Sequence, residues 1–391
     1  MPLAQGLRVR LFDANLSSPT LIEDLTDRLT TFTFTTRIHG GFERAKGTIS
    51  MSLEEAWQWL SSPELPGRFF FRLLVSREQD VIWEGRVMEI RLIVGGFQLR
   101  QSAADLRNAI TPLVGSTEGT VVTNSDSLSS YPRRELLLTL PAGSNANTQA
   151  DAATLASNER GDPKQSQEFQ VGAQGRLAQG IDFTALGYWS SCRDQYYSDD
   201  DAGNTDWTTS GAHSLDKIVK EILTEECPDI NSDQANIDTI SRDLVGIDLS
   251  GRKYAQAWIV DLMSVGDSDF GLPYFAIWED RKPYLRKRSI ATLDWRVFLR
   301  DPSRIWQAIS RDAGGDLAEK PMYYVRGGDT IRVDDLVPAS LLSPALDNQR
   351  TFWLRGTSYD AMKDVLTLQP DTPTRGLASI LPRLGQVERN Q

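Results

Sequence analysis

The chain is poor in the residues on which most active sites depend. Its 391 residues include only two histidines and two cysteines. His39 and His213 stand apart without the spacing of a metal-binding helix, and Cys192 and Cys227 are too distant for a CxxC pair. No GxSxG, GxxxxGK[ST] or GxGxxG motif occurs in the sequence. The usual signals for catalytic nucleophiles, phosphates and dinucleotides are missing, so we expect no catalytic residues and no cofactor.

Long apolar runs and an excess of positive charge are also missing. No stretch approaches the roughly 18 to 20 apolar residues that cross a bilayer, and the longest, FFFRLLV and RLIVGGF, are typical of strands. The start, MPLAQGLRVRLFDANL, has no apolar segment after a basic one, so we expect no Sec signal peptide and synthesis in the cytoplasm.

Acidic residues outnumber basic ones by 53 to 42, giving a net charge of −11. This charge opposes nucleic-acid binding and suits a surface along which DNA slides.

Length and composition predict a globular protein with more than one packed unit. The 391 residues exceed the usual domain size of about 100 to 200, and 40% apolar with 24% charged residues is a globular balance. Strand-like segments occur near both ends of the chain, and the predicted helices are short. The predicted fold class is mainly β with an α+β insert.

The clearest strand pattern lies between residues 67 and 103. Three apolar-rich segments are separated there by SREQD and by Gly95-Gly96. A Gly-Gly pair tolerates the positive φ of a two-residue hairpin, so residues 87–94 should pair with 97–103. Apolar residues on both faces of the middle strand predict a sheet that is covered twice or packed against another subunit. A second hairpin is predicted at Gly327-Gly328, between MYYVR and DTIRV.

Three helices carry start signals or apolar stripes. Ser52 and Glu55 have the spacing of a capping box. Further helices are predicted near 214–227, capped by Ser214, and near 254–265. The residues placed on their apolar faces are Leu53, Ala56, Trp57 and Leu60, then Leu215, Ile218, Val219, Ile222 and Leu223, and then Ala255, Trp258, Ile259 and Leu262.

Two segments are expected to contribute little to a core. Polar residues and glycine dominate from about 115 to 175, which predicts a functional excursion, or a partly disordered segment that an assembly partner orders. The prolines after residue 370 predict an extended C-terminal arm.

Two patterns offer weak signals of a binding site. Asp199, Asp201 and Asp206 in YYSDDDAGNTDW would suit Ca²⁺, but the ligand order of an EF-hand is missing, so a solvated acidic loop is the favoured interpretation and no metal is expected. The ten tryptophans would suit sugar stacking, but their scatter among apolar segments favours core and interface packing. A pair of carboxylates for glycoside hydrolysis needs no fixed spacing, so 53 acids give no information about one.

Subunit interfaces favour Trp, Tyr and Arg, and several segments combine these types. The candidate interface residues are Arg37, Phe42, Trp83, Arg86, Arg133, Arg134, Tyr196, Tyr197, Trp278 and Arg281.

The order of these motifs resembles a known family. FTFTTRIHGGFERAKGTISM, a short helix bearing Trp, and DVIWEGRVMEIRL followed by GGFQLRQSA are similar to the first domain of tail hub and minor tail proteins of tailed bacteriophages. LDKIVKEILTEECPDI, YAQAWIVDLMSVGD and FAIWEDRKPYLRKRS resemble the middle part of such hubs, and MYYVRGGDTIRV resembles the closing β segment.

The resemblance implies two tail-tube-like β-barrel or β-sandwich domains and a small α/β domain. The expected domains are 1–112, the first tube-like domain; 113–180, a polar insertion with one or two strands; 181–290, the α/β domain; and 291–370, a second β domain completed by strands from 130–212. Residues 371–391 would form the arm.

The resemblance also implies an assembly and its partners. The expected assembly is a ring at the tail tip, a homotrimer rather than a hexamer, made in the host cytoplasm and carried in the virion. Implied partners are the distal tail or tail tube protein, the tape measure protein and tail fibre or spike proteins. DNA would pass through the lumen without specific binding, and no membrane insertion is expected. The alternative is a tail-associated carbohydrate-binding or glycan-hydrolysing protein; a secreted binding module is disfavoured by the missing signal peptide and unpaired cysteines.

Overall fold

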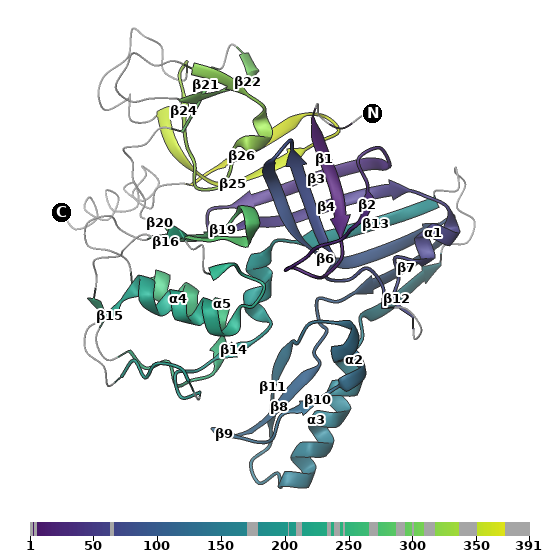
Figure 1. Ribbon diagram of the computed structural model, residues 1–391, viewed down its shortest axis with the longest axis vertical. Coiled ribbons are helices and arrows are strands. Elements are labelled where there is room, and N and C mark those ends of the chain that lie inside the picture. The colour runs from purple at the N-terminus through teal and green to yellow at the C-terminus, as the bar shows by residue number, and fades with distance from the viewer. Residues whose placement is uncertain are drawn as a thin grey trace, which may run out of the picture. The chain divides into compact units, whose positions relative to one another are not determined.

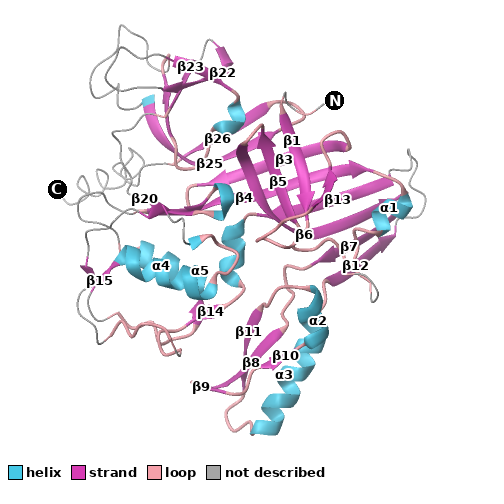
Figure 2. Cartoon of the chain, viewed as in Figure 1, coloured by secondary structure: helices cyan, strands magenta, loops and turns pink. Residues whose placement is uncertain are grey.

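The computed structural model describes residues 3, 6–62, 66–169, 179–201, 203–208, 213–232, 236–237, 243–244, 247–265, 273–286, 294–298, 301–308, 317–335 and 350–371. The protein is mainly β with a few helices, as predicted (Figures 1 and 2). It divides into two compact units, the first from residues 1–35, 40–288 and 359–365, and the second from 36–39, 289–358 and 366–391. The expected boundaries at 112 and 180 do not separate these units, and the expected arm lies outside the described residues beyond 371.

The sheet of the first unit is organised around its longest strand, β6. One edge of β6 pairs with β5 along its first half and with β7 along its second half, and the other edge pairs with β13. A register shift between Thr184 and Ala185 leaves Met88 as the extra residue of a β-bulge at the changeover. The strands are β1 (Leu7–Phe12), β2 (Leu21–Asp24), β3 (Leu29–Arg37), β4 (Gly40–Ser50), β5 (Arg72–Arg77), β6 (Asp80–Val94), β7 (Phe97–Ser102), β12 (Lys164–Phe169) and β13 (Gln179–Leu186).

The sheet stays open in the described part of the chain. From β5 the pairing continues to β1 and β2, from β7 to β12, and from β13 to β4. The closed barrel that the resemblance implies is not found among the described residues, because β5 and β7 share one edge of β6 and lead to separate ends. The hairpin at Gly95-Gly96 is confirmed: Val94 pairs with Phe97, and Gly95 has a φ of 58°.

Helix α1 (Leu53–Trp57) confirms the capping box but not its apolar face. The Ser52 side chain accepts a hydrogen bond from the Glu55 N–H, and the Glu55 carboxylate accepts one from the Ser52 N–H. Ala56 and Leu60 are buried. Leu53 and Trp57 are 38% and 51% exposed, so the prediction for these two side chains is wrong.

Helices α4 (Leu215–Glu226) and α5 (Ala255–Met263) lie where the apolar stripes predicted them, and all the residues predicted to face the core are buried. Ser214 occupies the N-cap position of α4, although its side chain makes no capping hydrogen bond. The two helices share a core with β19 (Tyr274–Ile277) and β20 (Pro283–Arg286), and β16 (Asn236–Ile237) pairs with β20.

Residues 109–160, which include most of the expected polar insertion, fold into an ordered lobe. In it β11 (Glu135–Leu140) runs parallel to β8 (Ala109–Val114), flanked by β9 (Thr117–Glu118) and β10 (Val122–Thr123). Helices α2 (Ser125–Ser130) and α3 (Ala146–Arg160) complete it. Helix α3 was not predicted, because it has no apolar stripe: the only buried residues on it are Ala153 and Ser157. The strands between 130 and 212 belong to the first unit and do not complete the second.

The second unit has a smaller sheet. Its strands pair in the order β23 (Leu317–Lys320), β22 (Asp301–Ala308), β21 (Trp295–Phe298), β24 (Thr330–Val333), β25 (Thr351–Asp360), with β26 (Val365–Pro370) following in the chain. The predicted hairpin at Gly327-Gly328 is wrong, because Met322–Tyr324 is a 3₁₀ helix and β24 pairs with β21 and β25 instead. Gly327 lies against Thr36, whose hydroxyl accepts its N–H at 2.8 Å.

Two short ladders pair β14 (Tyr196–Tyr197) with β18 (Lys253–Tyr254), and β15 (His213–Ser214) with β17 (Asp243–Leu244). Further 3₁₀ helices among the described residues are Tyr188–Arg193 and Glu279–Arg281. Within the described ranges, no helix has the length and apolar character to span a bilayer.

Candidate functional surfaces

One face of the main sheet is apolar and the other is polar. Along β3 the alternation TTFTFTT buries Phe32 and Phe34 on one side and turns Thr31 and Thr33 to the other. On the apolar side the ring of Phe183 lies 6.5 Å from that of Phe32 and 6.0 Å from that of Trp59, measured between centroids. The chain that follows α1 therefore covers the aromatic face and leaves the threonine face open.

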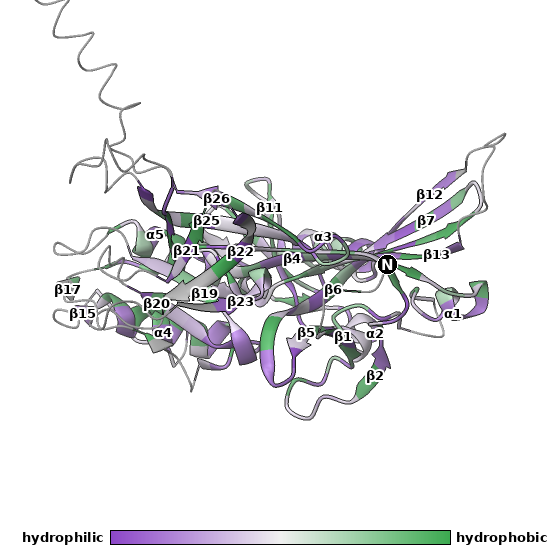
Figure 3. Ribbon diagram, turned by 90° about the horizontal axis from the view of Figure 1, so that it is seen from above, coloured by the Kyte–Doolittle hydropathy of each residue, from purple (hydrophilic) through white to green (hydrophobic). Residues whose placement is uncertain are grey.

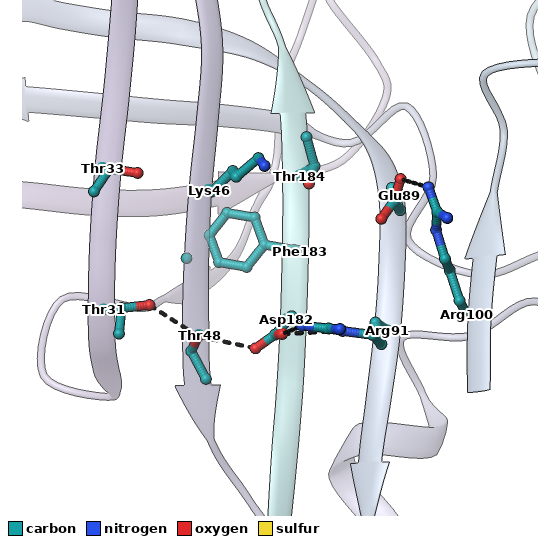
Figure 4. A pocket seen from close by; sticks show the side chains of 11 residues that line it. Thr31, Thr33, Lys46, Thr48, Glu89, Arg91, Arg100, Asp182, Phe183 and Thr184 are labelled. Carbon is teal, nitrogen blue, oxygen red and sulfur yellow. Dashed lines mark hydrogen bonds and ion pairs between the residues drawn. The ribbon is translucent and has the colours of Figure 1, made fainter. Parts of the chain in front are cut away.

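A chain of hydrogen bonds crosses the polar face from β3 to β7, and Figure 4 shows its links from Thr31 to Arg91. Thr31 donates to the Thr48 hydroxyl at 2.8 Å, and Thr48 donates to Asp182 at 2.9 Å. Arg91 donates to the other Asp182 oxygen from Nε and Nη2, and to Gln98 at 3.3 Å. Five neighbouring strands are thus joined by side chains as well as by their backbones.

The polar face surrounds a shallow hollow of about 530 Å³. A second ion pair, Arg100 with Glu89 at 2.6 Å, lies at its β7 side, while Lys46 has no ion-pair partner in the part of the chain that the structure describes. No tryptophan is among its lining residues. They are Thr31, Thr33, Lys46, Gly47, Thr48, Glu89, Arg91, Arg100, Asp182, Phe183 and Thr184, and Gly47 and Phe183 are the nonpolar ones.

Gly47 explains the glycine in the middle of a charged strand. A Cβ on Gly47 would lie 2.7 Å from the Phe183 ring, so the aromatic ring occupies the space that a side chain would need (Figure 4). Sequence reasoning missed Asp182 and Arg91 as partners, because 91 residues separate them in the chain.

Apolar side chains are also exposed on two elements, β2 and α1, that ion pairs connect. We call these side chains the β2–α1 surface: Leu21 and Ile22, which point to opposite faces of β2, with Leu53 and Trp57 of α1, all exposed. Leu53 and Trp57 are four residues apart and therefore share one side of the helix. Figure 3 shows hydrophobic stretches on both β2 and α1.

Ion pairs hold the two elements of the β2–α1 surface together. Arg28 bridges Glu23 of β2 at 2.5 Å and Glu55 of α1 at 3.0 Å, and Arg68 also pairs with Glu23 at 2.5 Å. Hydrogen bonds from the backbone and side chain of Ser52 lower the pKa of Glu55 and keep it charged at the helix start. The surface thus combines a large indole, aliphatic side chains and charges of both signs.

Most of the predicted interface residues lie inside the fold instead of on its surface. Phe42, Trp83 and Tyr197 are almost completely buried, and Tyr196 and Trp278 are buried in the chain's own core. Tyr196 stacks on Tyr254 with a centroid distance of 4.1 Å. Composition cannot separate an interior aromatic residue from an interfacial one, because both are apolar with a polar tip.

Two of the candidate arginines, Arg86 and Arg134, belong to a buried ion-pair network. Asp194 accepts hydrogen bonds from Arg86 at 2.6 Å and from Arg134 at 2.7 Å, and Arg86 also pairs with Asp229 at 2.9 Å. Burial disfavours the charged form of both groups. It lowers the pKa of Arg134 to about 10 and raises the pKa of Asp229. These charges stabilise the chain internally and are not available to a neighbouring subunit.

A second branch of the network involves Arg281, whose backbone N–H donates to the buried Glu84 carboxylate at 2.5 Å, while the Arg72 guanidinium pairs with Glu84 at 2.6 Å. Of the predicted interface residues, Arg37, Arg133 and Arg281 are not buried, and Arg133 pairs with Glu135 at 2.7 Å.

The three aspartates considered as calcium ligands have separate roles. Asp199 accepts the Leu249 N–H at 3.0 Å, Asp201 pairs with Arg252 at 2.6 Å, and Asp206 accepts the Thr208 N–H at 2.9 Å. Among the described residues no three His, Cys, Asp or Glu side chains are placed to hold a metal.

The chain has a similar protein of known structure but no match in sequence. No protein-family model matches the chain, and no curated protein matches it in sequence. The chain is similar to the 43 kDa tail protein of prophage MuSo2 from Shewanella oneidensis, with a TM-score of 0.42 and 5% identity over 94% of this chain and 97% of that one.

Proposed function

We propose that the chain is a structural subunit of a bacteriophage tail, located in the hub or baseplate at the tail tip. Copies of it assemble into a ring, most simply a homotrimer. The motifs at 32–51 and 80–103, which resemble tail hub proteins, support the setting. The observation that carries the self-association is the β2–α1 surface.

The β2–α1 surface has the features of a contact between copies. Trp57 is 51% exposed on a helix whose capped start fixes its orientation. Tryptophan is among the residues that contribute most to binding at interfaces. Strand β2 pairs with β1 on one edge, and no described ladder covers the other edge, so its backbone and Leu21 and Ile22 are open to a partner strand. The charges of both signs around Glu23 and Arg28 then favour one orientation of the partner.

The polar face suits water rather than a second protein surface. The Arg91 side chain is 42% exposed and its partner Asp182 is 23% exposed, so water solvates this pair. Burying such a pair in an interface would remove that hydration for little gain. In a ring, this face would line the channel, where paired charges and hydroxyls give DNA no strong site to bind.

The ring would contact the distal tail or tail tube protein, the tape measure protein and tail fibre or spike proteins, and it would be carried in the virion. We propose no catalysis and no cofactor. If the chain were a glycan-binding or glycan-hydrolysing protein, we would expect a tryptophan beside the carboxylates of the polar-face hollow. The residues that line this hollow include no tryptophan.

Multi-angle light scattering and negative-stain microscopy of the full chain test the assembly. We expect concentration-dependent rings, and a Trp57→Ser/Leu53→Ser variant that remains monomeric with an unchanged melting temperature. Leu155→Ser is the matched control, since Leu155 is 70% exposed on α3, outside the β2–α1 surface, and its replacement should leave rings intact.

Two results would oppose the proposal. A wild-type chain that stays monomeric at its solubility limit, both alone and with a tail tube protein, would rule out self-association. Antibody labelling of intact phage particles away from the tail tip would rule out the location.

A further inference from the structure

A second hollow, of about 280 Å³, lies within the first unit where the lobe meets the main sheet. Helix α2 and the residues after it supply one wall, and the segment after β1 supplies Ala14 and Leu16. The sheet side supplies Phe70 and Arg86, with Tyr188 and Asp229 completing the lining. The hollow is therefore built from segments far apart in the sequence.

Two polar groups at this hollow have no partner within the described chain. Tyr188 is 2% exposed, and its hydroxyl makes no hydrogen bond to any described residue. The Nε of Arg86, which is also 2% exposed, is likewise unpaired. Burial and the neighbouring Glu84 and Asp229 raise the pKa of the Tyr188 phenol, so it keeps its proton and can donate it in a hydrogen bond. Buried polar groups are nearly always paired in proteins, so these two call for a bound acceptor.

The charges around the hollow favour one further negative group. The guanidinium groups of Arg72, Arg86 and Arg134 pair with Glu84, Asp194 and Asp229. The Arg281 guanidinium donates instead to the backbone carbonyls of Asp229 and Leu16, so within the described ion pairs no carboxylate offsets its charge. Asp229 itself lines the hollow and would repel a doubly charged ligand. A monoanion meets both conditions.

Backbone strain occurs at the same place. Phe70 has a φ of 65°, a conformation that bulky residues rarely adopt. Its ring lies against Tyr131, with 5.9 Å between centroids, and the Arg86 and Arg134 guanidinium carbons lie 5.3 and 5.8 Å from its centroid. Such strain is often concentrated at ligand sites, where the surrounding packing maintains it.

We propose that this hollow binds a carboxylate carried by a compact apolar body. The carboxylate accepts hydrogen bonds from the Tyr188 hydroxyl and from Arg86. The apolar body lies among Leu16, Leu128 and Phe70, which line the rest of the space. The carboxylate comes either from a small free acid or from the C-terminus of a protein partner. The inference does not depend on ring assembly.

Titration calorimetry on the full chain tests the site with benzoate, with benzamide, and with a tripeptide ending in leucine as either the acid or the amide. We expect benzoate to bind and benzamide to bind at least roughly tenfold more weakly, since a charged hydrogen bond is lost. Binding of the acid peptide but not its amide, in preference to benzoate, identifies a C-terminus as the ligand; the reverse preference identifies a free acid.

Tyr188→Phe removes only the unpaired hydroxyl. We expect it to weaken benzoate binding roughly tenfold while leaving the melting temperature of the free protein unchanged, because no internal hydrogen bond is lost. Tyr284→Phe is the control, since Tyr284 does not line the hollow and its hydroxyl donates to Glu279 at 2.8 Å, and it should bind benzoate like the wild type.

The proposal is overturned if neither benzoate nor the acid peptide binds. It is also overturned if benzamide binds as well as benzoate, or if Tyr188→Phe binds benzoate as tightly as the wild type.

Discussion

Arg91 on β6 contacts one oxygen of Asp182 on β13 with two nitrogens, Nε at 3.1 Å and Nη2, while the other Asp182 oxygen accepts the Thr48 hydroxyl. The pair lies at the centre of the polar face, and it links the β3–β4 side of the sheet to the β6–β7 side. Its energetic role differs from that of the buried network, because water reaches both of its members.

Replacing Asp182 with alanine should therefore cost little stability. Partly exposed ion pairs contribute about 0.2 to 1 kcal/mol, and salt screens them. We expect a loss of about 1 kcal/mol in urea unfolding at low salt and a smaller loss at high salt. A loss of several kcal/mol that is insensitive to salt would show that the polar face is a structural core and not a wet surface.

Replacing Asp194 with alanine should be far more damaging. The change leaves Arg86 and Arg134 buried without their shared carboxylate, and breaking a buried pair typically costs about 3 to 5 kcal/mol. Chemical denaturation measures the loss. Arg133→Ala is the control: the Arg133 side chain is 44% exposed, so its pair with Glu135 should be worth less than about 1 kcal/mol. Equal effects of the two changes would contradict the internal role of the network.

Gly327→Ala tests the close approach of two backbones within the second unit. The new Cβ would lie 2.4 Å from the Arg37 carbonyl carbon and 2.5 Å from the Ile38 nitrogen, and backbone atoms cannot move aside as side chains do. We expect a loss of about 1 to 3 kcal/mol or more in thermal unfolding. Gly251→Ala, which meets nothing within 4 Å, should be nearly neutral.

Asp329 should make the second unit less stable as pH rises. Burial raises its pKa to about 7, although the Arg326 N–H and the Trp295 indole N–H both donate to it at 2.8 Å. Since an unfolded aspartate has a pKa of about 3.9, the folded state binds the extra proton between about pH 4 and pH 7, and stability declines over that window.

Replacing Asp329 with asparagine keeps an accepting oxygen at this position and removes the charge. The wild type loses stability as the pH rises through the window, whereas the asparagine does not titrate. We therefore expect Asp329→Asn to raise the melting temperature more at pH 8 than at pH 5. An equal shift at both pH values would show that Asp329 is already charged throughout this window.

The features predicted correctly all depend on neighbours in the chain. The Gly95-Gly96 hairpin requires only a turn that allows positive φ, and the Ser52 capping box requires only residues three apart. The stripes of α4 and α5 are visible because each helix buries one continuous side. Such signals are complete within a dozen residues, so no knowledge of the rest of the fold is needed.

The features that were missed depend on distant partners. Trp57 has the spacing of a core residue, yet nothing in the described structure covers it, and it marks the exposed surface instead. Arg86 and Arg134 have the composition of an interface, yet Asp194 holds both inside. The polar lobe lacked apolar periodicity, because small residues such as Ala153 and Ser157 suffice for close packing of α3.

The mainly β class, the Gly95-Gly96 hairpin, two core helices and the shortage of catalytic groups could all be inferred from the amino-acid sequence, since each depends on local spacing or on counts of residues. The folded chain was needed to show that the sheet stays open among the described residues, that Asp182 meets Arg91 across the polar face, and that Tyr188 has an unpaired hydroxyl beside a hollow. Those outcomes depend on which strands share an edge and on which distant side chains the strand pairing brings together, and no short stretch of sequence contains that information.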